Sequence, residues 1–110
     1  SKSEIIIADH LRRYGVVYKY EKPLELTVHG RRVTFYPDFT VMNSRTGRIY
    51  YLEHFGMMDN EDYYNAVLRK LDAFEMNQLL IGRDVLLLHE SSSAPLNTRV
   101  LDCYIQEYLV

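Results

Sequence analysis

Two acidic residues lie inside segments whose composition predicts β-strands. Asp38 follows Pro37 in the run Val33–Met42. Glu53 lies in the next such run, Ile49–Phe55. Carboxylates are disfavoured in strands and are seldom buried without a partner, and two of them on neighbouring strands would repel each other. A divalent cation between them would remove that repulsion, and hard oxygen ligands are what Mg²⁺ takes, so the pair predicts a metal site.

Each acid also has an ordinary structural role open to it. Asp38 could be a turn or N-cap residue after Pro37, and Glu53 could lie on a solvated face of the sheet. Taken together, at the ends of adjacent strands and before a crossover helix, the two acids favour the metal site.

The first half of the chain predicts one helix and three strands that position these acids. Ser1 and Glu4 form a capping-box pattern, so a helix begins there, and Gly15 marks its end. Three strand-like runs follow, separated by turn-forming residues: Val16–Val28, which is broken around Pro23, then Val33–Met42 and Ile49–Phe55. Because both connections are short, we expect an antiparallel meander.

The second half predicts a crossover helix, a strand and a last helix. The acidic segment Asp59–Asp62 suits the positive end of a helix dipole, and that helix ends near Asn77. Its apolar residues recur with the helical period: Tyr64, Val67, Leu68, Leu71 and Phe74. The strand Val85–Leu88 follows and is expected to lie parallel to the strand before the helix, and the last helix runs from Thr98 to Leu109. We expect an α/β fold of order αβββαβα, with a mixed four- to five-stranded sheet flanked by helices.

The composition is that of one ordinary globular domain covering all 110 residues, with 47% hydrophobic and 25% charged residues. The lone Cys103 excludes an internal disulfide and a multi-cysteine zinc site, and its place in an amphipathic segment predicts a core position. The longest apolar runs are four residues, far short of the roughly 20 needed to span a bilayer, and a secretory segment is missing. We expect a soluble, cytoplasmic protein. Since the chain starts at Ser1 without Met, we also expect a domain excised from a longer protein or a trimmed product.

The order of these elements and acids resembles the PD-(D/E)XK nuclease superfamily over nearly the whole chain. The likeness lies in an opening helix with Glu4, the Pro37-Asp38 pair in a β-meander, Glu53 on the next strand, and then a helix and a fourth strand. It implies a restriction-endonuclease-like core and a nuclease, endo- or exonucleolytic, that hydrolyses phosphodiester bonds in DNA. It further implies Asp38 and Glu53 as catalytic ligands of Mg²⁺, with Mn²⁺ as a substitute, and Glu4 as an accessory metal ligand. The choice of DNA over RNA comes from the resemblance alone.

The lysine of that superfamily stands two residues after the Glu, and here that position is Phe55. Strand alternation puts Phe55 on the face of Glu53 and His54 on the other. Some branches of the superfamily carry the lysine on the following helix, where Lys70 lies on the edge of the apolar stripe and can extend its ammonium toward the sheet. We therefore expect Lys70 as the third catalytic residue, although it could also be an ordinary surface lysine.

These groups suit phosphodiester hydrolysis. A metal held by Asp38 and Glu53 would polarise a non-bridging phosphate oxygen and lower the pKa of a bound water. Lys70 would stabilise developing charge or orient that water.

Contacts to nucleic acid would have to be local, because a formal charge of −2 argues against a uniformly basic surface. Arginines at the end of the first helix and in turns could grip phosphates without reading sequence, or could simply be solvated: Arg12, Arg13, Arg31, Arg32, Arg45 and Arg48. Tyr63 could stack on a base, whereas Tyr64 is expected in the core. His54 is a further candidate contact to nucleic acid.

Two other interpretations stay open. The first is a catalytically inactive nuclease-fold domain used for DNA binding or protein interaction, which Phe55 favours. The second is a small interaction module without a metal site. The Glu-His-Phe-Gly run at residues 53–56, followed by an acidic helix start, also resembles nuclease-like segments attached to bacterial helicases. Attached helicase-type domains are therefore possible partners, and exposed Tyr and Leu side chains of the last helix could support a homodimer.

Overall fold

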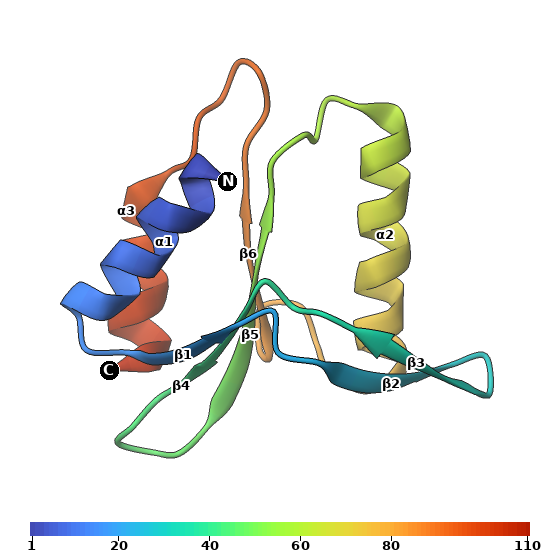
Figure 1. Cartoon of the computed structure of the whole chain (residues 1–110), viewed down its shortest axis with the longest axis horizontal. Helices are drawn as coiled ribbons and strands as arrows, with labels where there is room; N and C mark the ends of the chain where they lie inside the picture. Colours follow the sequence, from blue (N-terminus) through green and yellow to red (C-terminus); the bar gives the residue numbers. More distant parts are fainter.

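The computed structural model describes residues 1–110 and contains three α-helices, six strands and a closing π-helical turn (Figure 1). The helices are α1 (Lys2–Arg13), α2 (Glu61–Met76) and α3 (Thr98–Tyr104), and α3 continues into η1 (Ile105–Leu109). The strands are β1 (Val17–Tyr20), β2 (Leu24–Val28), β3 (Arg31–Phe35), β4 (Phe39–Met42), β5 (Ile49–Phe55) and β6 (Val85–His89). None of the helices combines the length and the apolar character needed to cross a membrane.

The principal sheet has four strands in the order β1-β4-β5-β6. The pairs β1–β4 and β4–β5 are antiparallel, and β5–β6 is parallel. Helix α2 makes the crossover between β5 and β6, so the expected parallel pair is confirmed. Helices α1 and α3 lie together on one side of the sheet and α2 lies on the other (Figure 1). The expected α/β class and the mixed sheet flanked by helices are confirmed.

The predicted break of Val16–Val28 around Pro23 is confirmed, since β1 ends at Tyr20 and β2 begins at Leu24. The predicted meander is wrong in one respect, because its second strand, Val33–Met42, is also divided, at residues 36–38. Pro37 has no N–H to donate to a strand ladder, which explains the second break. The inner halves pair with each other as the separate antiparallel hairpin β2–β3, inserted between β1 and β4. Asp38 therefore lies in a bend just before β4, not inside a strand.

Two hydrophobic clusters hold the layers together. The larger one fills the space between the sheet and the α1–α3 pair, and the smaller one lies between α2, the hairpin and β6. Helix α2 buries only Val67, Ala73 and Phe74, so the predicted core position of Tyr64 is wrong. Leu68, from the same apolar stripe, is exposed too; the exposed fractions are 43% for Tyr64 and 42% for Leu68.

Cys103 was also expected in the core and is exposed. The buried stripe of α3 and η1 consists of Leu101, Ile105 and Leu109. Cys103 lies about 200° around the helix from Leu101, because each residue turns the helix by roughly 100°.

The helix ends follow the sequence signals. The capping box of Ser1 and Glu4 is present at the start of α1. Asn60 caps the start of α2, and Asn77 ends it. The Asn77 side chain also holds the hairpin, since its Oδ1 accepts from the Thr27 N–H and its Nδ2 donates to the Thr27 carbonyl, both at 3.0 Å. The hairpin leads directly into Asp38, so this attachment helps to place the acid.

Replacing Asn77 by Ala removes both bonds to β2, and we expect the free energy of unfolding to fall by about 1–2 kcal/mol, since each such bond contributes about 0.5–1.5 kcal/mol. Urea unfolding followed by circular dichroism measures the change. Glu75→Ala, at an exposed position of the same helix, is the control and should stay within about 0.5 kcal/mol of the parent. Equal stability of Asn77→Ala and the parent would contradict the assigned role of Asn77.

Candidate active site

Asp38, Glu53 and Lys70 line one small pocket between the sheet and α2. Asp38 comes from the bend before β4, Glu53 from β5, and Lys70 from the third turn of α2. The pocket has a volume of about 190 Å³. The rest of its lining consists of His54, Phe55, Tyr63, Ala66 and Val67. The three residues predicted to be catalytic are thus brought together from three separate elements.

The Asp38 carboxylate extends the hydrogen-bond ladder beyond the end of β4. Strand β4 begins at Phe39, which pairs with Leu52 of β5. Past that pair, the His54 N–H has no β4 residue opposite it and donates to Asp38 Oδ2 at 2.7 Å. A backbone donor of β5 therefore holds the acid of the bend against the strand that carries Glu53.

Glu53 is the buried acid of the site. Its side chain is fully buried, Lys70 Nζ donates to its Oε2 at 2.9 Å, and its Oε1 has no hydrogen-bond partner. Burial raises the pKa of Glu53 to about 8; the charge of Lys70 opposes this rise, and the nearby Asp38 adds to it. A divalent cation would stabilise a buried carboxylate in such surroundings.

Lys70 reaches the pocket from the edge of α2, as the helical period predicts. Its side chain is 23% exposed, and its Nζ also lies 3.5 Å from the Tyr36 carbonyl oxygen. The expected alternation along β5 is present as well. Phe55 is buried and lines the pocket with Glu53, whereas the His54 side chain contacts Glu90, which in turn contacts α1. The placement of Lys70 is confirmed, and its role in catalysis stays a prediction.

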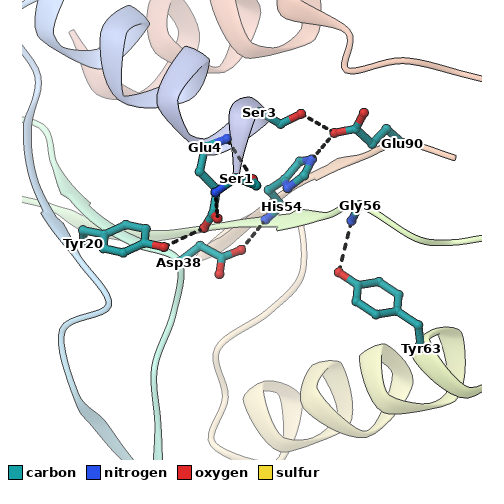
Figure 2. Close-up of polar contacts among 9 residues, drawn as sticks. All are labelled: Ser1, Ser3, Glu4, Tyr20, Asp38, His54, Gly56, Tyr63 and Glu90. Atoms are coloured by element: carbon teal, nitrogen blue, oxygen red, sulfur yellow. Dashed lines mark hydrogen bonds and ion pairs between the residues drawn. The ribbon is translucent and has the colours of Figure 1, made fainter. Parts of the chain in front are cut away.

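Glu4 lies in a second, larger pocket of about 540 Å³ that shares Asp38, His54 and Tyr63 with the first. Its Oε2 accepts from the Tyr20 hydroxyl at 3.1 Å, and its Oε1 accepts from the terminal amine at 3.2 Å (Figure 2). Glu4 and Glu53 therefore approach Asp38 from different pockets.

The donors fit Mg²⁺ as a hydrated ion. No three His, Cys, Asp or Glu side chains are grouped closely enough to hold one metal ion between them. Mg²⁺ commonly keeps several waters and binds through one or two carboxylates, and Asp38 together with the unpartnered Oε1 of Glu53 supplies such a pair. Glu4 stays a predicted outer ligand.

The predicted nucleic-acid contacts divide into two groups. Tyr63 and His54 line both pockets, and the Tyr63 hydroxyl accepts from the Gly56 N–H at 3.0 Å. Arg12 pairs with Asp9. Arg12 and Arg13 stand in the last turn of α1, about 12 Å along the helix from Glu4 at 1.5 Å per residue. The two arginines are not brought to the site.

Glu90 was not among the residues expected at the site, yet it lines the larger pocket. Its Oε1 accepts from the Ser3 hydroxyl at 2.5 Å and from His54 Nε2 at 2.6 Å. The bond from Ser3 lowers the pKa of Glu90 against the effect of desolvation, and the contact with His54 lowers it further. One signal could have found it: Glu90 directly follows β6, and the carboxyl ends of parallel strands such as β5 and β6 meet at one edge of a sheet.

Because Glu53 gains its proton more readily in the folded state, the stability of the protein should depend on pH. The folded pKa of about 8 lies above the ordinary value of 4.5 for a glutamate, so this contribution is fully present below pH 4.5 and is lost as the pH rises toward 8. Glu53→Gln cannot ionise. We expect its free energy of unfolding, relative to the parent in EDTA, to rise between pH 4.5 and 8 by about 1 kcal/mol or more, since one pKa unit equals about 1.4 kcal/mol.

Urea unfolding at several pH values measures this difference, with Glu75→Gln as the exposed control. A difference that stays constant across the range would mean that Lys70 keeps Glu53 ionised throughout, and would contradict the prediction.

Comparison of the chain with protein-family models, curated proteins and solved structures gives no match. A functional assignment therefore depends on the geometry of the site and on the chemistry of its residues.

Proposed function

We propose that this chain is a metal-dependent nuclease domain of the PD-(D/E)XK type that hydrolyses phosphodiester bonds in DNA. The observation that carries the proposal is the convergence of Asp38, Glu53 and Lys70 on one pocket, with an unpartnered, fully buried oxygen on Glu53. A buried acid with that environment is a candidate functional group, because structural carboxylates are usually fully hydrogen-bonded.

The arrangement of the elements also supports the proposal. Once the β2–β3 hairpin is set aside, the remaining elements follow the order α1, three antiparallel strands, α2, a parallel strand and α3. This is the order on which the resemblance to the superfamily depends. Asp38 precedes the central antiparallel strand and Glu53 lies on its neighbour, an arrangement that supports a metal site shared by the two acids.

Each residue of the pocket would have its own role in phosphodiester hydrolysis. Asp38 and Glu53 would hold Mg²⁺, which when bound polarises a phosphate oxygen and makes hydroxide available near neutral pH. Lys70 is partly exposed, so its ammonium can turn from Glu53 to the pocket opening and donate to a phosphate oxygen or to the attacking water. Tyr63, which lines both pockets, would contact an adjoining nucleotide, whereas the His54 ring is only 7% exposed and is paired with Glu90.

One observation favours a second candidate, an inactive domain of the same fold that binds DNA or another protein. The Lys70–Glu53 pair already compensates the buried charge without a metal, and Phe55 occupies the position of the superfamily's lysine. A buried ion pair of this kind is found in proteins as a purely structural feature. The two candidates differ in one measurable property, which is cleavage of DNA.

Plasmid and single-stranded DNA incubated with Mg²⁺ or Mn²⁺ should be nicked or degraded, and EDTA should stop the reaction. Asp38→Asn and Glu53→Gln should lose about 100-fold or more in rate. Lys70→Ala should lose about 100-fold, as removal of one transition-state donor typically does. Arg69→Ala removes an exposed positive charge from the neighbouring position of α2 and is the control; it should retain its rate.

Full activity of Lys70→Ala would remove the lysine from the mechanism and leave the two acids. DNA binding without cleavage by the parent protein on any substrate would select the inactive domain. Cleavage that persists in EDTA would rule out the metal-dependent mechanism.

A further inference from the structure

One carboxylate oxygen ties three separate parts of the chain together beside the proposed site (Figure 2). Oε1 of Glu90 accepts from Ser3 Oγ and from His54 Nε2. Ser3 lies in the first turn of α1, His54 in β5, and Glu90 directly after β6. Because an ionised carboxylate can only accept, the Nε2 atom of His54 must carry the proton in this contact.

The His54 ring is held from both sides. Its side chain is 7% exposed, and Glu90 lies at one end of it. Gly56 lies against it on the chain, where a Cβ atom would come within 3.2 Å of His54 Cε1. Such a distance is tighter than most Cβ contacts, so a side chain at residue 56 would require the ring to shift by a few tenths of an ångström. Glu90 itself is anchored, since its N–H donates to the Phe55 carbonyl at 2.9 Å.

Both partners of Glu90 adjoin residues of the proposed site. Ser3 precedes Glu4 on the first turn of α1, so its position sets that of Glu4. His54 follows Glu53, and its N–H holds Asp38 Oδ2 at 2.7 Å. The oxygen of Glu90 thus connects the helix turn that carries Glu4 to the strand that holds Asp38. Both parts line the larger pocket.

We propose that Glu90 is a positioning residue that fixes the first turn of α1 against the end of β5 and so sets Glu4 opposite Asp38. This inference rests on the proposed function, because it assigns Glu90 the task of holding the metal-binding acids in place. Residues that do not touch a metal ion but hold its ligands in place by hydrogen bonds orient those ligands. Their loss commonly weakens metal binding about 10- to 100-fold.

Amide hydrogen exchange by NMR on the metal-free protein tests the positioning directly. In Glu90→Ala the His54 amide, which donates to Asp38, should exchange about tenfold faster than in the parent. Glu90→Gln keeps an oxygen acceptor at the same place and should exchange at nearly the parent rate. Glu107→Ala, at an exposed position of η1, is the matched control and should leave the His54 amide unchanged. If Glu90→Ala does not fold, Ser3→Ala removes one of the two bonds with Glu90 in place and should accelerate exchange of the Glu4 amide.

Calorimetric titration with MgCl₂ gives the second measurement. Glu90→Ala should bind Mg²⁺ about tenfold more weakly or worse, and Glu90→Gln should bind it nearly as well as the parent. Unchanged exchange and unchanged Mg²⁺ affinity in Glu90→Ala would overturn the inference. Equal losses in Glu90→Ala and Glu90→Gln would overturn it too, since the charge and not the position would then be what matters. A parent protein that binds no Mg²⁺ would overturn the proposed function instead, and the exchange rates would still decide whether Glu90 positions Asp38.

Discussion

Burial of the Glu53 carboxylate is the constraint on which the candidate site depends. Removing a carboxylate from water is costly unless a cation or several donors meet it, and Glu53 is fully buried between β5 and α2. Lys70 meets one of its oxygens, and the other is left without a partner. The strand, the crossover helix and the lysine are thus coupled through one side chain, and Asp38 adds a second acid to the same pocket.

The fold could be predicted largely where the signals are local. The capping box at Ser1, the acidic start of α2 and the crossover to β6 depend on neighbouring residues and were expected correctly. The β2–β3 hairpin was not expected. The break around Pro23 was, but nothing local says that the half after it pairs with the first half of Val33–Met42 instead of joining the principal sheet. Tyr64 and Leu68 obey the helical period, yet α2 buries only Val67, Ala73 and Phe74 and leaves both of them exposed.

The residues of the candidate site also differ in how far the sequence could identify them. Asp38 and Glu53 were identifiable because acids are out of place in strand-like runs, and Lys70 because helix geometry limits where a long side chain can reach. Glu90 depends on contacts with Ser3 and His54, which lie 87 and 36 positions away along the chain. Such a network forms only when α1, β5 and the end of β6 are brought to one end of the sheet. The position of Glu90 directly after β6 is the one signal of it that the sequence offers.

The most direct test of the account is an anomalous-diffraction map of crystals of this protein soaked in MnCl₂. We expect a peak between Asp38 and Glu53, about 2.1–2.2 Å from a carboxylate oxygen of each, distances typical of hard divalent ions. The Lys70 ammonium should then have moved away from Glu53. A map without a peak in this pocket, with Lys70 still paired to Glu53 at high Mn²⁺, would contradict the metal site and leave the ion pair as a structural feature of the fold.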